Sequence, residues 1–162
     1  MKRVHVFGIG SLSGDDQAGW LVVDALRALG LERDAPLVLD KLDRPGASLL
    51  TRLEGADHVI LIDAMRGGGA PGDIRRLDPS DWASAAADVS SHGFGLAAAL
   101  ALADALGGLP ARVELYGIEI GAAQPGETVS APVHAAAATL GRQLADALRS
   151  GVGTFAHEVF RV

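Results

Sequence analysis

The sequence contains no cysteine among its 162 residues. Structural disulfides, thiolate nucleophiles and sulfur ligands for soft metals are therefore excluded, which leaves carboxylate oxygens and imidazole nitrogens as metal ligands. Positive charge is also scarce, since 14 Lys and Arg residues stand against 20 Asp and Glu residues and give a net charge of -6. No run of basic residues is present, so nucleic acid or an anionic membrane would meet a mostly repulsive surface. Neither is expected as a partner.

Long hydrophobic runs are absent as well. The apolar stretch near the start, residues 4–9, is interrupted by His5 and Gly8 and is too short for a signal-peptide core or a membrane span. A cytoplasmic protein is expected. The length and the 49% hydrophobic content suit one domain with its own core. We expect a single domain over residues 1–150, followed by a C-terminal tail over residues 151–162 to which no role is assigned.

Short apolar runs alternate with segments of helical period along the chain. Strands are expected at 4–7, 37–39, 59–62, 74–77 and 113–120, and helices at about 15–29, 47–53, 94–106 and 130–149. The run Val59-Ile60-Leu61-Ile62 is typical of a strand buried on both faces. The glycine-rich segment 67–72 predicts a loop that forms a rim or lid. The fold class predicted is α/β, a single three-layer α/β/α domain with a mostly parallel twisted sheet of the phosphorylase or hydrolase kind.

Three side chains stand where such a sheet builds its site. Asp16 follows the first strand, Asp63 closes the third, and His92 opens a later helix. Ligands of open parallel sheets bind outside the carboxyl ends of the strands. Two carboxylates and an imidazole make a ligand set suited to Ni, Zn, Mn or Fe, with coordination positions left open as a catalytic metal requires.

Each of these residues also has a structural interpretation. Asp15 and Asp16 would cap the helix that follows them, but consecutive residues point in different directions, so one capping role does not explain both. The Asp63 side chain would hydrogen-bond the backbone of a turn, and His92 would belong to the sequence that caps the next helix. A dinucleotide-binding interpretation of Gly8-Ile9-Gly10 fails, because Gly14 comes one place late and two carboxylates would repel a pyrophosphate.

The remaining histidines have no carboxylate partner by position and are treated as structural or surface residues. They are His5, His58, His134 and His157.

Several motifs, taken in order, resemble one known family, the maturation endopeptidases of [NiFe]-hydrogenases. The motifs are Gly8-Ile9-Gly10 with Gly14-Asp15-Asp16-Gln17-Ala18-Gly19, Leu61-Ile62-Asp63-Ala64 with Gly69-Ala70-Pro71-Gly72, Ser91-His92-Gly93-Phe94-Gly95-Leu96, and Tyr116-Gly117-Ile118-Glu119. The resemblance covers most of the chain. It implies that Asp16, Asp63 and His92 form both the catalytic and the metal-binding site.

The resemblance also implies a substrate. The enzyme would remove a short C-terminal peptide from the precursor of a hydrogenase large subunit after nickel insertion, and nickel carried by the precursor would be the recognition element. The metal would polarise the scissile carbonyl or activate a bound water, or Asp16 or Asp63 would act as general base on water.

Two departures from the family pattern fall near Asp16. Ser11 replaces a common asparagine, and the loop from Gly10 to Asp15 is one residue shorter than usual, which leaves open whether Asp15 or Asp16 is the ligand.

Two other functions are compatible with the sequence. One is a module that binds a metalloprotein without cutting it. The other is a small-molecule hydrolase or phosphorylase, in which Arg66, Arg75 and Arg76 would bind phosphate, although solvated arginines are the simpler interpretation.

Overall fold

A computed structural model of the chain describes residues 3–33, 37–82, 94–121 and 124–151. Five strands form one sheet: β1 (Val4–Gly10), β2 (Leu37–Asp43), β3 (His58–Met65), β4 (Ile74–Leu77) and β5 (Arg112–Glu119). The helices are α1 (Ala18–Ala28), α2 (Ser48–Arg52), α4 (Phe94–Ala105) and α5 (Ala131–Ser150), with short 3-10 turns η1 (Gly14–Gln17) and η2 (Leu31–Arg33).

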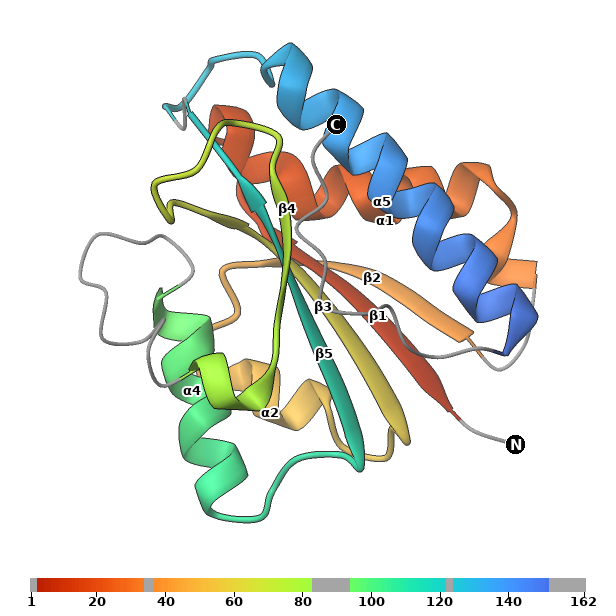
Figure 1. The fold of residues 1–162 in the computed structure, drawn as a ribbon. Coiled ribbons are helices and arrows are strands. Elements are labelled where there is room, and N and C mark those ends of the chain that lie inside the picture. The colour runs from red at the N-terminus through yellow and green to blue at the C-terminus, as the bar shows by residue number, and fades with distance from the viewer. Residues whose placement is uncertain (1–2, 34–36, 83–93, 122–123, 152–162) are drawn as a thin grey trace.

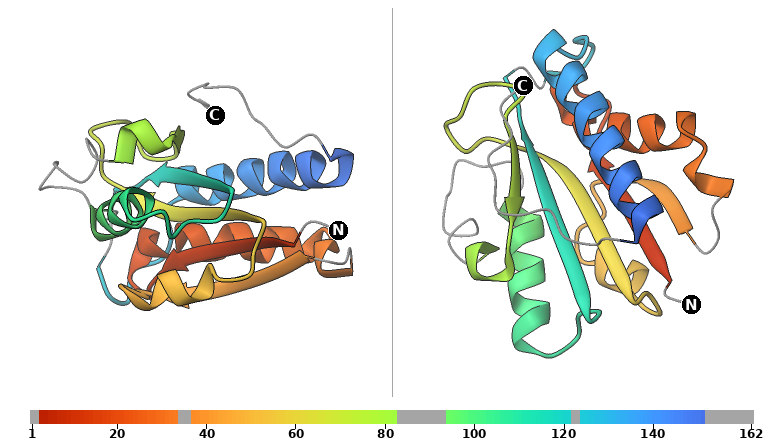
Figure 2. Two further views of the ribbon diagram at one scale, coloured as in Figure 1. Left: turned by 90° about the horizontal axis from the view of Figure 1, so that it is seen from below. Right: turned by 45° about the vertical axis from the view of Figure 1, so that its right-hand side comes forward.

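The strand order in the sheet is β2-β1-β3-β5-β4, and every pair is parallel except β4 with β5. Consecutive parallel strands are linked through helices, as parallel pairing requires. Figure 1 shows α1 and α5 on one side of the sheet and α2 and α4 on the other, and the second panel of Figure 2 shows the same division. The predicted three-layer α/β/α fold with a mostly parallel sheet is confirmed.

Alternation along β3 divides the core into two layers. Ile60, Ile62 and Ala64 pack in the cluster that contains the apolar faces of α1 and α5. Val59 and Leu61 pack in the other cluster, with side chains of α2 and α4. Because successive side chains of a strand point to opposite faces, Asp63 belongs to the face covered by α2 and α4.

The strands extend further than the apolar runs predicted. β2 continues past residue 39 to Asp43, and β3 continues past Asp63 to Met65. Asp63 therefore lies inside its strand instead of closing it, because pairing with β5 continues as far as Met65 and Glu119. A strand ends where its hydrogen bonding to the neighbouring strand ends, and the apolar pattern of the sequence does not reveal that pairing.

Two glycines allow the start of α1 to sit directly on β1. A Cβ atom at Gly8 would lie 2.2 Å from the carbonyl oxygen of Gly19. A Cβ atom at Gly19 would in turn lie 2.4 Å from the carbonyl oxygen of Ile62 in β3. The turn that carries Asp15 and Asp16 is thus held close to the ends of both strands.

No helix in the described parts of the chain is long and apolar enough to cross a membrane. The expected tail, apart from Gly151, lies outside the described residues.

Candidate active site

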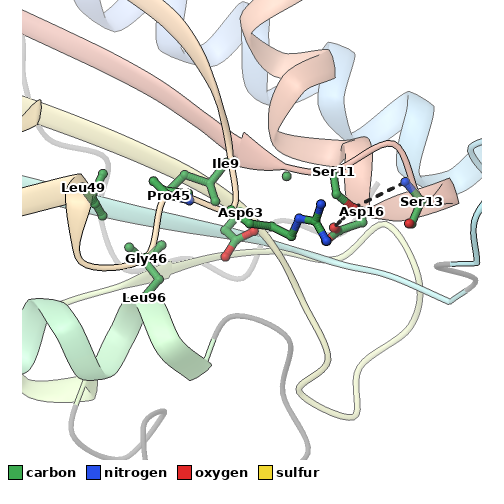
Figure 3. A pocket seen from close by; sticks show the side chains of 11 residues that line it. Ile9, Ser11, Ser13, Asp16, Pro45, Gly46, Leu49, Asp63 and Leu96 are labelled. Atoms are coloured by element: carbon green, nitrogen blue, oxygen red, sulfur yellow. Dashed lines mark hydrogen bonds between the residues drawn. The ribbon is translucent and has the colours of Figure 1, made fainter.

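A cavity of about 370 Å³ opens at the carboxyl ends of β1, β2 and β3, on the face of the sheet covered by α2 and α4. Its size is that of a pocket for a small ligand or a peptide side chain. The described residues that line it are Ile9, Gly10, Ser11, Ser13, Asp16, Arg44, Pro45, Gly46, Leu49, Asp63 and Leu96. In Figure 3 the apolar side chains gather at one end and the serines with Asp16 at the other, with Asp63 between them. The structure therefore brings Asp16 and Asp63 into one pocket.

Asp16 lies in the short turn η1 and is only 8% exposed. Its Oδ2 atom accepts a hydrogen bond from the hydroxyl of Ser11. The backbone N–H of Ser13 points to the same hydroxyl oxygen at 3.4 Å (Figure 3). Ser11, noted in the sequence only as a departure from a family pattern, thus orients the Asp16 carboxylate.

Glycine is required at position 10 for this arrangement. A Cβ atom there would lie 2.3 Å from the backbone oxygen of Asp16, closer than real atoms approach. The backbone N–H of Ser11 also donates to that oxygen, at 3.4 Å. The end of β1 and the turn that presents Asp16 are therefore in direct backbone contact.

Asp63 is 9% exposed, and its Oδ1 atom accepts a hydrogen bond of 2.8 Å from the backbone N–H of Ala64. Burial, together with the negative charge of Asp16, raises the pKa of Asp63 to about 8. Both effects disfavour a second negative charge in a poorly solvated pocket. At neutral pH the free pocket therefore holds Asp63 in its protonated form, and an incoming cation would favour its ionisation. Paired carboxylates whose environment shifts one pKa are typical of functional sites.

Asp15 is fully buried and faces away from this cavity. Its Oδ1 atom accepts the backbone N–H of Ser130 at 2.6 Å, and its Oδ2 atom accepts the Ser130 hydroxyl at 2.9 Å and the Gly121 N–H at 3.2 Å. Ser130 is the N-cap residue directly before α5. Asp15 thus connects η1 to the start of α5, and of the two adjacent aspartates it is Asp16 that reaches the pocket.

His92 lies outside the described residues, so its position relative to the two aspartates is not part of the structure. Within the parts of the chain that are described, no three His, Asp or Glu side chains are grouped as a metal site.

The three arginines considered for phosphate binding make contacts within the protein. Arg66 donates to the carbonyl of Gly121 and Arg75 to that of Gly67. Arg76 is largely buried and forms ion pairs with Asp78 and Glu114. These contacts favour the structural interpretation of all three.

The glycine-rich loop predicted as a rim or lid is attached to the end of β5. The N–H of Gly67 lies 3.0 Å from both carboxylate oxygens of Glu119, and the N–H of Gly72 donates to the Glu119 carbonyl. None of the described residues that line the pocket comes from this loop.

Sequence reasoning missed the contribution of the loop after β2. Arg44, Pro45 and Gly46 line the pocket, and Arg44 is bound through its N–H to the carbonyl of Gly10 at 3.2 Å. The placement of this loop depends on the pairing of β2 beside β1, which ends at Gly10 and Asp43. Nothing in the local sequence signals it.

A mostly parallel sheet with two buried carboxylates at its carboxyl edge is the architecture of an α/β protein whose ligand site lies at the usual place for open sheets. The hydrogenase maturation protease family matches residues 44–147, which is more than half of the chain. The chain belongs to this family, and it is a peptide hydrolase of hydrogenase maturation.

Solved structures support the assignment. The hydrogenase maturating endopeptidase HybD from E. coli is 28% identical, with 93% of this chain and 94% of that chain covered and a TM-score of 0.73. A hydrogenase 2 maturation peptidase from Thaumarchaeota archaeon SCGC_AB-539-E09 is 29% identical, with 91% and 99% covered and a TM-score of 0.67. The protease HycI from Thermococcus kodakarensis KOD1, at 23% identity and a TM-score of 0.70 over 91% and 93% of the two chains, shares the fold. No curated protein sequence matches the chain.

Proposed function

We propose that this endopeptidase acts in the cytoplasm on the precursor of a [NiFe]-hydrogenase large subunit and removes its C-terminal peptide after nickel has been inserted. Nickel would arrive with the substrate, and Asp16, Asp63 and His92 would supply ligands from the enzyme. The observation that carries the proposal is the meeting of the two nearly buried side chains of Asp16 and Asp63 in one pocket of a hydrogenase maturation protease.

The chemistry of the pocket supports recognition through a cation. Burial first and the charge of Asp16 second oppose ionisation of Asp63, as its raised pKa indicates, and a divalent cation bound between the two side chains would favour the ionised form of both. His92 stands two residues before the start of α4, and Leu96 of the same helix lines the pocket. The order of the chain is thus compatible with a third ligand from this segment.

Recognition by a shared metal would make cleavage a test of nickel loading. A precursor without nickel would lack the bridge between its own metal ligands and the enzyme carboxylates, and it would be bound poorly. Hydrolysis would then follow one of two routes. Either the metal polarises the scissile carbonyl or activates water, or one aspartate removes a proton from the attacking water.

The proposal is tested by incubating the enzyme with nickel-loaded and nickel-free precursor and following the products by gel and mass spectrometry. We expect release of one defined C-terminal peptide from the loaded precursor alone. Asp16→Ala, Asp63→Ala and His92→Ala are each expected to abolish processing while the fold is kept. The matched control is Asp24→Ala, which removes a half-exposed carboxylate paired with Lys41 outside the pocket.

Normal processing by His92→Ala would falsify the metal-site model. Equal cleavage of loaded and nickel-free precursor would remove nickel as the recognition element, and binding without cleavage would contradict the peptidase assignment for this substrate.

A further inference from the structure

Arg44 brings a positive charge to the pocket of the two aspartates. Among the described residues that line the cavity, its side chain is the only cationic one. It is 76% exposed, whereas Asp16 and Asp63 are nearly buried. The buried part of the pocket is therefore acidic. The exposed guanidinium lies where a substrate that enters from solvent can contact it.

The backbone of Arg44 is held in an unusual conformation. Its φ angle is 40°, and among the described residues no other non-glycine residue has a positive φ. Pro45 follows, which further restricts the residue before it. The hydrogen bond from the Arg44 N–H to the Gly10 carbonyl holds Arg44 against the end of β1. Glycine would adopt this conformation without strain, so an arginine at this place points to a use for its side chain.

The present partner of the guanidinium is easily exchanged. Arg44 Nε donates to Asp43 Oδ1 at 2.9 Å, and the Asp43 side chain is 56% exposed. Ion pairs between exposed neighbours contribute little to stability because water screens them. The guanidinium can therefore move to another acceptor at small cost.

We propose that Arg44 is a specificity-determining residue, which binds an acceptor oxygen of the precursor peptide next to the pocket. The inference rests on the proposed function. The planar guanidinium fork offers several N–H donors to a carboxylate or to backbone carbonyls. The negative charge of Asp16 repels such oxygens, so Arg44 fixes which part of the peptide lies over the mouth of the pocket and which part faces Asp16 and Asp63.

The test is steady-state cleavage of nickel-loaded precursor by Arg44→Asn and Arg44→Lys. Asparagine tolerates positive φ, so the first variant removes the charge while keeping the backbone. The matched control is Arg52→Gln, which removes an exposed arginine paired with Asp40 and absent from the pocket lining. We expect Arg44→Asn to raise KM about tenfold with kcat nearly unchanged, as loss of uniform substrate binding predicts. Arg52→Gln should behave as the wild type.

Two further measurements distinguish a carboxylate from backbone carbonyls as the group that Arg44 binds. A carboxylate carries a full charge that salt screens, so the wild-type KM would rise with salt, and Arg44→Lys, which keeps the charge without the fork, would have a KM between those of the wild type and Arg44→Asn. Backbone carbonyls need the fork, so Arg44→Lys would then resemble Arg44→Asn, with little effect of salt. Thermal melts of each variant check the fold, and Arg44→Gln replaces the asparagine variant if the latter is unstable.

An unchanged KM in Arg44→Asn, or a loss carried by kcat alone, would overturn the role of Arg44 while wild-type cleavage still supports the proposed function. Failure of the wild-type enzyme to cleave its cognate loaded precursor would overturn both.

Discussion

Asp16 and Asp63 line the same pocket but have different surroundings. The Asp16 carboxylate accepts the hydroxyl of Ser11, while Asp63 accepts the backbone N–H of the next residue. Asp63 is the group whose pKa rises to about 8, through burial first and the charge of Asp16 second. An acid that keeps its proton because it is buried does so at the expense of stability, a frequent property of functional residues.

The raised pKa of Asp63 predicts a specific dependence of stability on pH. The folded state holds a proton that the unfolded chain releases above its ordinary pKa of 3.8, so the wild type loses stability as pH rises from about 4 to about 8. Asp63→Asn retains an acceptor for Ala64 and has no such charge. We expect this variant to be more stable than the wild type by at least ~1 kcal/mol at pH 8, with a smaller difference at pH 5.

Urea unfolding of both proteins at several pH values measures this difference. An Asp63→Asn variant that is less stable than the wild type at pH 8 would show that the carboxylate is ionised and stabilised in the fold.

At the scale of elements, the turn η1 is fixed from two sides. Because Gly10 has no side chain, the backbone of η1 can approach the end of β1, and Asp15 binds Ser130, the N-cap residue of α5. α5 packs tightly on α1, since a Cβ atom at Gly141 would lie 2.7 Å from that of Ala25. The position of Asp16 thus depends on the first and last helices of the described chain.

Removal of the Asp15 carboxylate is therefore expected to affect both stability and catalysis. Asp15→Ala removes a fully buried carboxylate and leaves the part-buried donors of Ser130 and Gly121 without their acceptor, so we expect a loss of about 1–3 kcal/mol in the free energy of unfolding. Cleavage should fall as well, because the turn that carries Asp16 loosens. Denaturant unfolding and precursor cleavage measure the two effects, with Asp24→Ala as the exposed control.

A stability loss below about 0.5 kcal/mol, the range of ordinary surface substitutions, would contradict the structural role of Asp15.

In the whole molecule, the opposite end of the sheet carries a buried charge cluster. His58 Nε2 and Glu114 Oε2 are 2.6 Å apart, and Arg76 and Arg112 approach Glu114 Oε1 within 3.3 and 3.2 Å. The expectation that His58 has no carboxylate partner is therefore wrong. Burial alone would raise the pKa of Glu114, but the hydrogen bond and charge of His58 and the charges of both arginines outweigh it and lower that pKa.

We expect the charge cluster around Glu114 to stabilise the fold and to have no role in catalysis. A lowered folded pKa means that Glu114 stabilises the fold above its unfolded value of 4.5 and loses this contribution as pH falls through the folded value. Glu114→Gln should lower the free energy of unfolding by roughly 2–4 kcal/mol at pH 7, with the two proteins converging at acidic pH. Cleavage well below the melting temperature should stay normal.

Thermal melts between pH 3 and pH 7 and a cleavage assay measure both parts of this prediction. A cleavage defect in a folded Glu114→Gln variant would connect this end of the sheet to the active site.

The sequence by itself determined the elements and the edge at which the site forms. The apolar run 59–62, the helical periods and the glycine stops follow from local physics, and they place Asp16 after the first strand and Asp63 near the carboxyl end of the third. Hydrophobic period and turn chemistry act within a few residues, so they are readable without a structure.

Only the tertiary structure decided which atoms meet across long separations. In the structure Asp15 binds Ser130, whereas Asp16 lines the pocket. Arg44 lies beside the end of β1, and His58 pairs with Glu114. These contacts follow from strand order and register, which bring together segments 34 to 115 residues apart. The physical reason is that hydrogen bonds and charges act over a few ångströms, and only the packed sheet brings such distant residues that close.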